Sequence, residues 1–169
     1  MDFSSVNGKV AIVTGAGSGI GEAVAKIFGE NRMKVVCADI NIEQGQAVAD
    51  KICANGGDAI FVQTDCSENS QVRNLIDRTV EHYGKLDGIV NNAGIGQGGR
   101  PLHEYEMEEY DKIFELNSKG VFAGMKYAQK QSLNPTVRVD FYSMWHPLQV
   151  LSHSEDRLFI QQQSMELLA

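Results

Sequence analysis

Apolar residues in the first 131 positions follow two alternating patterns. Short runs rich in Val, Ile and Ala are typical of buried strands, and each is followed by a segment with the apolar periodicity of a helix face. The predicted strands cover residues 9–13, 34–39, 58–65 and 86–92, and the predicted helices cover residues 22–28, 42–55, 70–83 and 105–131. We expect the last helix to be broken or softened near residues 117–120.

Strands that alternate with helices at this spacing predict an α/β fold, a doubly wound parallel sheet of the Rossmann-like type with right-handed crossovers. Gly56 and Gly84 are expected to follow helix ends, and Ser67 is expected to cap the third helix. After residue 131 the pattern changes, because all 17 glycines come before Ser143. We therefore predict that the sheet is truncated after the fourth strand and its helix, with one further strand allowed at residues 136–142.

Composition limits the partners. The chain has 169 residues and a formal net charge of −7 with no long basic run, which argues against nucleic acid or an anionic membrane surface as a partner. No apolar run is long enough to span a bilayer and no secretory signal is visible, so we expect a cytoplasmic location. The histidines and cysteines lack ligand spacing, so no metal site is predicted. The cysteines are expected to be buried, reduced thiols: Cys37, Cys53 and Cys66.

The stretch from Thr14 to Gly21, TGAGSGIG, lies between the first predicted strand and the first helix. Glycines there permit backbone conformations closed to other residues and let a ligand approach the main chain. The N–H groups and the positive dipole end of the following helix favour an anion such as a pyrophosphate. The stretch predicts a dinucleotide-binding turn, and a tight strand-to-helix turn without a ligand is the alternative that the pattern leaves open.

Further motifs occur in order on the predicted elements, and with them residues 6–131 resemble the classical short-chain dehydrogenase/reductase family. The glycine turn fits the family's TGxxxGxG pattern, and Asn91 to Gly94 fit its NNAG motif. Asp65 fits the acidic residue that meets the adenine amino group. Asn117 fits the asparagine of the family's catalytic proton relay, whereas by itself it is more typical of a structural residue that distorts a helix. The resemblance implies a partial NAD-binding domain at residues 6–131 and a non-family tail at residues 132–169.

The resemblance also implies that the cofactor contacts the turn and the ends of the next three strands. The implied cofactor-binding residues are Gly15, Ser18, Gly19, Ile20, Asp39, Asp65, Cys66, Asn92, Ala93 and Gly94. Asp39 ends the second strand, where a carboxylate accepts hydrogen bonds from both adenosine ribose hydroxyls and repels a 2′-phosphate. Members that prefer NADP usually carry a basic residue where this chain has Ser18, Ile40 and Asn41. The predicted cofactor is therefore NAD, and a solvated carboxylate without a ligand is the alternative for Asp39.

The family's chemistry also needs a Tyr-x-x-x-Lys pair and a serine at the end of the fifth strand. The tyrosine exchanges a proton with the substrate oxygen, and the lysine lowers the tyrosine pKa. No tyrosine of this chain has a lysine four positions on, and the tyrosines are Tyr83, Tyr105, Tyr110, Tyr127 and Tyr142. The resemblance thus implies an NAD-dependent oxidoreductase of alcohol or ketone groups, but we expect this chain to be inactive. The alternative is a non-catalytic, truncated dinucleotide-binding fragment or isoform.

The residues after about 131 suggest an origin for this loss. A one-base shift of plausible codons there gives a Tyr-x-x-x-Lys pattern, with a serine ahead of it, at the family's spacing. We hypothesise that the tail is a frameshifted form of a family sequence. Without the later strands and the companion of the helix at 105–131, we expect marginal stability and an impaired homo-oligomer interface. The fourth strand would be an open edge unless residues 136–142 pair with it.

Overall fold

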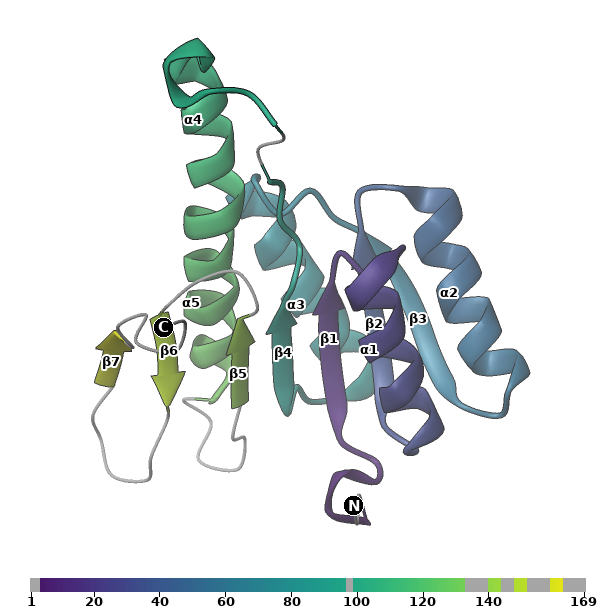
Figure 1. Cartoon of the computed structure of the whole chain (residues 1–169). Coiled ribbons are helices and arrows are strands. Elements are labelled where there is room, and N and C mark those ends of the chain that lie inside the picture. Colours follow the sequence, from purple (N-terminus) through teal and green to yellow (C-terminus); the bar gives the residue numbers. More distant parts are fainter. Residues whose placement is uncertain (1–3, 97–98, 133–139, 144–147, 152–158, 163–169) are drawn as a thin grey trace, which may run out of the picture.

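The centre of the fold is a five-stranded parallel sheet (Figure 1). The computed structural model describes residues 4–96, 99–132, 140–143, 148–151 and 159–162. The strands, in their order across the sheet, are β3 (Asp58–Gln63), β2 (Lys34–Asp39), β1 (Val10–Thr14), β4 (Gly88–Asn91) and β5 (Asp140–Ser143). The direction of winding reverses between β1 and β4, as in other doubly wound sheets. The predicted fold class and the four predicted strands are confirmed.

Helices cover both faces of this sheet, because alternate strand residues point to opposite sides. Val13 and Cys37 pack in one apolar cluster with residues of α1 (Gly19–Glu30) and α2 (Ile42–Ala54). Ile12 and Val36 pack in a second cluster with residues of α3 (Asn69–Tyr83) and α5 (Val121–Ser132). The near-continuous apolar runs of β1 and β2 are therefore buried between two helical layers.

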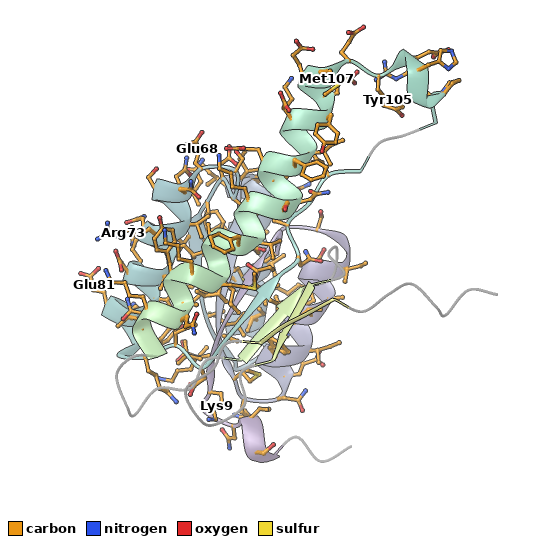
Figure 2. The ribbon with its side chains drawn as sticks, turned by 90° about the vertical axis from the view of Figure 1, so that its left-hand side faces the viewer. Lys9, Glu68, Arg73, Glu81, Tyr105 and Met107 are labelled. Carbon is orange, nitrogen blue, oxygen red and sulfur yellow. The ribbon has the colours of Figure 1, made fainter. Side chains whose placement is uncertain are left out.

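One long helical rod follows β4 and the loop that contains the short helix η2 (Leu102–Glu104). It begins as α4 (Met107–Phe114), continues through the π-helical segment η3 (Glu115–Gly120) and ends as α5. The predicted helix over residues 105–131 is confirmed, and the expected softening is this change of helical type. Figure 1 shows that α4 extends beyond the ends of β1 and β4, and in Figure 2 Tyr105 and Met107 lie at the end of the molecule opposite Lys9.

The ends of α2 and α3 follow the expected glycine chemistry at their C-termini. Gly56 and Gly84 have φ angles of 81° and 76°, in the left-handed region that glycine adopts most readily. The prediction that Ser67 caps α3 is wrong. The N-cap residue is Glu68, and the Ser67 hydroxyl instead donates a hydrogen bond to the Asp65 carboxylate at 2.6 Å. A local side-chain bond has thus competed successfully with the helix cap.

The tail contributes β5, which pairs with β4 from Gly88 opposite Asp140 to Asn91 opposite Ser143. This strand overlaps the predicted 136–142 segment at residues 140–142, and residues 136–139 lie outside the described ones. The β4 edge is therefore covered along these four pairs. The sequence did not predict the antiparallel pair of β6 (Leu148–Leu151) and β7 (Phe159–Gln162).

The three cysteines are free, and their environments differ. Cys37 is buried in the first apolar cluster, as expected, and Cys66 is partly buried. The expectation of burial is wrong for Cys53, which is exposed on α2, where its thiol donates a hydrogen bond to the Ala59 carbonyl at 3.3 Å.

Candidate functional site

The residues singled out from the sequence meet at the carboxyl edge of the sheet. The glycine turn follows β1, Asp39 ends β2, Asp65 and Cys66 follow β3, and residues 92–94 follow β4. Because parallel strands end at the same edge, the fold brings together segments that are far apart in the sequence. The centre of the group lies beside the β1–β4 pair, the switch point at which ligands bind in open α/β sheets.

The glycine turn is packed tightly against the end of β4. Gly15 has a φ of 65°, and a Cβ built on it would lie 2.9 Å from Asn92 Nδ2 and 3.0 Å from Ala93 Cα. A Cβ on Gly21 would overlap the Gly15 carbonyl oxygen. Both the backbone conformation and the close approach therefore require glycine. Ala16 and Gly17 of the turn are buried, and residues 18–20 are exposed.

Thr14 joins the end of β1 to the end of β4. Its hydroxyl accepts hydrogen bonds from the N–H groups of Asn92 and Ala93, each at 3.0 Å, and donates to the Val90 carbonyl at 3.3 Å. The side-chain amide of Asn92 also donates a hydrogen bond to the Thr14 carbonyl at 2.9 Å. Thr14 and Asn92 are both buried, so these bonds are shielded from water. Thr14 is not among the cofactor-binding residues expected from the sequence, where a hydroxyl at the end of an apolar strand was the available signal.

The N-terminus of α1 faces this turn. Ser18 is the N-cap residue, but its backbone is extended and its side chain makes no capping hydrogen bond. The first-turn N–H groups are thus left without a cap from Ser18, and they carry the positive end of the helix dipole. The acidic residue of that turn, Glu22, pairs with Lys26, whose hydrogen bond lowers the Glu22 pKa. This arrangement suits an anion.

Asp39 is held by two main-chain N–H groups. Gly17 donates to its Oδ2 at 2.7 Å, and Asn41 donates to its Oδ1 at 2.9 Å. The carboxylate is half-buried, and its backbone carbonyl accepts a bond from the Thr64 N–H at 2.9 Å. A carboxylate has about four acceptor positions. The two amides therefore fix its orientation and leave roughly two positions open for further donors.

Asp65 and Cys66 form the part of the site that follows β3. Asp65 Oδ1 accepts bonds from the Ser67 N–H at 2.9 Å and from the Ser67 hydroxyl at 2.6 Å. Burial, with a smaller contribution from Asp65, raises the pKa of the Cys66 thiol to about 12. The thiol is thus protonated near neutral pH and a poor nucleophile. A Cβ on Gly120 would lie 2.5 Å from the Cys66 carbonyl oxygen, so the helical rod lies directly on this segment.

Exposed isoleucines border the same edge. Ile20 follows the glycine turn, Ile40 follows Asp39 and Ile95 follows Gly94, and their exposed fractions are 51%, 62% and 44%. Large apolar side chains left in water near polar groups are typical of a ligand-binding surface. They supply apolar contacts beside the carboxylates and N–H groups already described.

Asn117 is committed to the loop that leaves β4. Its Oδ1 accepts a bond from the Ile95 N–H at 2.9 Å, and its Nδ2 donates to the Ile95 carbonyl at 2.7 Å. This pair of bonds fixes the loop against η3, which is a structural role, and the catalytic role implied by the resemblance stays a prediction. Asn91 points elsewhere: it is buried against Gly124 of α5, and its Nδ2 has no hydrogen-bond partner within the described residues.

Tyr83 lies at the amino edge of the sheet, opposite the candidate site. Tyr83 donates a hydrogen bond at 2.9 Å to Asp58, the first residue of β3. Burial, followed by this bond, raises the Tyr83 pKa, which opposes proton exchange near neutral pH.

Among the described residues there is no group of three or more His, Cys, Asp or Glu that could hold a metal ion, and no helix long and apolar enough to cross a membrane.

Comparison with known proteins gives a family match over most of the chain. Residues 9–135 match the model of a family described as short chain dehydrogenase. A tropinone reductase-like 2 protein of Erythroxylum coca is 45% identical over 128 residues, which are 74% of this chain and 46% of that protein. An uncharacterized oxidoreductase of Thermotoga maritima is 38% identical over 128 residues, or 76% of this chain and 50% of that protein.

A solved structure agrees with the fold. The crystal structure of a short chain dehydrogenase from Mycobacterium avium has a TM-score of 0.76 and 35% sequence identity, covering 82% of this chain and 53% of that chain. The chain thus spans about half the length of the relatives it matches. The matched family segment contains every residue of the candidate site.

The Thr14 hydroxyl gives a testable prediction. Thr14→Val keeps the shape of the side chain but leaves the N–H groups of Asn92 and Ala93 without their acceptor. We expect it to lower the free energy of unfolding by about 2 kcal/mol or more, as measured by urea denaturation. Thr14→Ser retains the hydroxyl and is the matched control, expected to lose less than half as much. Equal stability of the Val variant and the native chain would contradict the structural role of these bonds.

Proposed function

This chain belongs to the short chain dehydrogenase family, and we propose that its carboxyl-edge site binds NAD(H). When bound, the nicotinamide ring of this cofactor accepts or donates a hydride in the oxidation or reduction of an alcohol or ketone group. The observation that carries the proposal is the Asp39 carboxylate, oriented by two main-chain N–H groups beside the glycine turn. Such a carboxylate suits a ribose with free hydroxyls and repels a phosphate in their place.

The remaining contacts follow from the chemistry at each strand end. The N–H groups after Ser18 would meet the pyrophosphate, since they are uncapped by that side chain and carry the helix dipole. Asp65 would accept a hydrogen bond from the adenine amino group, with Ile20 and Ile40 in apolar contact. Residues 92–94 would pack along a ribose, held in place by Thr14. The dinucleotide would thereby touch the ends of four strands.

We propose that this polypeptide does not turn over substrate. The sequence has no Tyr-x-x-x-Lys pair, and Tyr83 has a raised pKa and lies away from the candidate site. This favours the second candidate function, a non-catalytic dinucleotide-binding fragment. The family match ends at residue 135, near the predicted limit at residue 131, which supports a domain over 6–131 and a non-family tail over 132–169. The frameshift origin of the tail stays a hypothesis for the transcript sequence to test.

The association state and location belong to the same proposal. Met107, Tyr110 and Phe114 are exposed on α4, where they form an apolar stripe at helical spacing. We propose that the homo-oligomer interface of the family is impaired in this chain, because the family match ends at residue 135, soon after α5. The cytoplasmic location expected from composition likewise stays a prediction.

Cofactor preference is the first test. We expect the purified chain to bind NADH about ten-fold or more tightly than NADPH, because a 2′-phosphate would lie beside the Asp39 charge. Asp39→Ala should remove most of this preference. Asp77→Ala, which removes an exposed carboxylate on α3, is the matched control and should leave the preference unchanged. Fluorescence titration measures both affinities, and tighter binding of NADPH by the native chain would overturn the assignment.

Turnover is the second test. The assay uses NAD with a panel of secondary alcohols, or NADH with the matching ketones. We expect the NADH absorbance to change no faster with the protein than without it. The reason is that no tyrosine of the chain has the lysine partner that lowers its pKa for proton exchange. The same preparation must bind NADH in the titration. Sustained turnover proportional to protein concentration would show that other residues supply the proton.

A further inference from the structure

Gly17 is a glycine whose backbone does not require one. Gly15 and Gly19, its neighbours in the turn, have φ angles of 65° and 56°, whereas Gly17 is not among the residues with positive φ. The restriction at Gly17 is space. A Cβ built there would lie 2.9 Å from both Cγ and Oδ2 of Asp39, and 3.1 Å from Cβ of Gln44. A side chain at this position therefore has to displace the carboxylate.

The same residue binds the carboxylate that it makes room for. The Gly17 N–H donates to Asp39 Oδ2 at 2.7 Å, which is short for a nitrogen donor and typical of a bond to a charged acceptor. Gly17 lies in the turn that follows β1, and Asp39 is the last residue of β2, so this contact joins the turn to the end of the neighbouring strand. Bonds of this type are roughly twice as strong as those between neutral groups.

Other groups prevent the carboxylate from turning away. The Asn41 N–H holds Oδ1 at 2.9 Å, and the Asn41 side chain in turn accepts the Gln44 N–H at the start of α2. Gly45 lies beside the Cβ of Asp39. A Cβ on Gly45 would lie 3.2 Å from Asp39 Cβ and would overlap the Phe61 ring. Asp39 is thus confined by the glycine turn, by Asn41 and by the first turn of α2.

We propose that Gly17 is a positioning residue that determines the specificity of the adenosine subsite. It acts by holding the Asp39 carboxylate in place. It orients the carboxylate so that the two remaining acceptor positions face a pair of adjacent hydroxyls, the 2′,3′-diol of a ribose. It also keeps the carboxylate from rotating away from a 2′-phosphate, so a phosphorylated ribose is rejected. This inference rests on the proposed function, because it concerns the ligand of the same site.

The direct experiment replaces Gly17 by Ala and titrates the full chain with NADH and NADPH. We expect the affinity for NADH to fall about ten-fold or more and the affinity for NADPH to change much less, so that the preference collapses. Gly96→Ala is the matched control, since a Cβ there meets nothing within 4 Å, and it should leave both affinities unchanged. A Gly17→Ala variant that keeps the native preference would overturn the inference.

A double-mutant cycle separates this role from general damage to the turn. If Gly17 acts through Asp39, Gly17→Ala should weaken NADH binding no more than about two-fold in an Asp39→Ala background. The Asp39→Ala change also removes the two nearest atoms that the new Cβ would meet, Cγ and Oδ2 of Asp39, so the double variant should unfold at a higher temperature than Gly17→Ala alone. Additive losses in binding would show that Gly17 acts independently of Asp39 and would overturn the inference.

A measurement without cofactor distinguishes failure of the inference from failure of the proposed function. In the ligand-free chain, the Gly17 amide should exchange with solvent about ten-fold or more faster in Asp39→Ala than in the native protein, as followed by NMR. Unchanged exchange would overturn the Gly17–Asp39 contact itself. If the exchange changes but the native chain binds neither dinucleotide, the proposed function fails, and the specificity role with it.

Discussion

The site depends on one buried hydroxyl. Thr14 lies at the last position of β1, and its oxygen satisfies two N–H groups at the end of β4 while donating to a carbonyl of that strand. Unpaired N–H groups in a buried position would cost free energy, so this contact fixes the spacing of the two strand ends. The glycine turn and the Asn92 segment can then approach so closely that there is no room for a side chain at position 15. The carboxyl edge of the sheet is organised around this junction.

A parallel sheet gives the rest of the arrangement. All five strands end at one edge, so single residues at positions 17, 39, 65 and 92 become neighbours without any loop longer than the crossovers. Dinucleotide binding needs such an edge: N–H groups for phosphate, a carboxylate for a diol and apolar contacts for a base. Hydride transfer to or from a carbonyl carbon needs in addition a group that exchanges a proton with the oxygen. Among the tyrosines that the structure describes, Tyr83 has a raised pKa, and the proposed function therefore separates cofactor binding from turnover.

Much of this fold follows from local patterns in the sequence. The apolar runs of β1 to β4 and the glycines after α2 and α3 specify their elements directly, and the bounds of β2 agree residue for residue. Contacts between distant residues could not be predicted in this way. The Asn117 side chain finds its partners 22 residues away at Ile95, and Ser67 prefers the Asp65 carboxylate to the helix it precedes. The sequence alone places Gly17 only in a turn, because its contact with Asp39 exists only when β1 and β2 are in register.

Amide hydrogen exchange of the chain with and without saturating NADH, followed by peptide mass spectrometry, tests the proposed cofactor site directly. We expect slower exchange in the presence of NADH at residues 14–21, 39–41, 64–66 and 92–95, where main-chain groups face the proposed cofactor. We expect no change over α4, which extends beyond the sheet. Protection confined to α4 or to the amino edge, with none at residues 14–21 and 39–41, would contradict a dinucleotide site at the carboxyl edge.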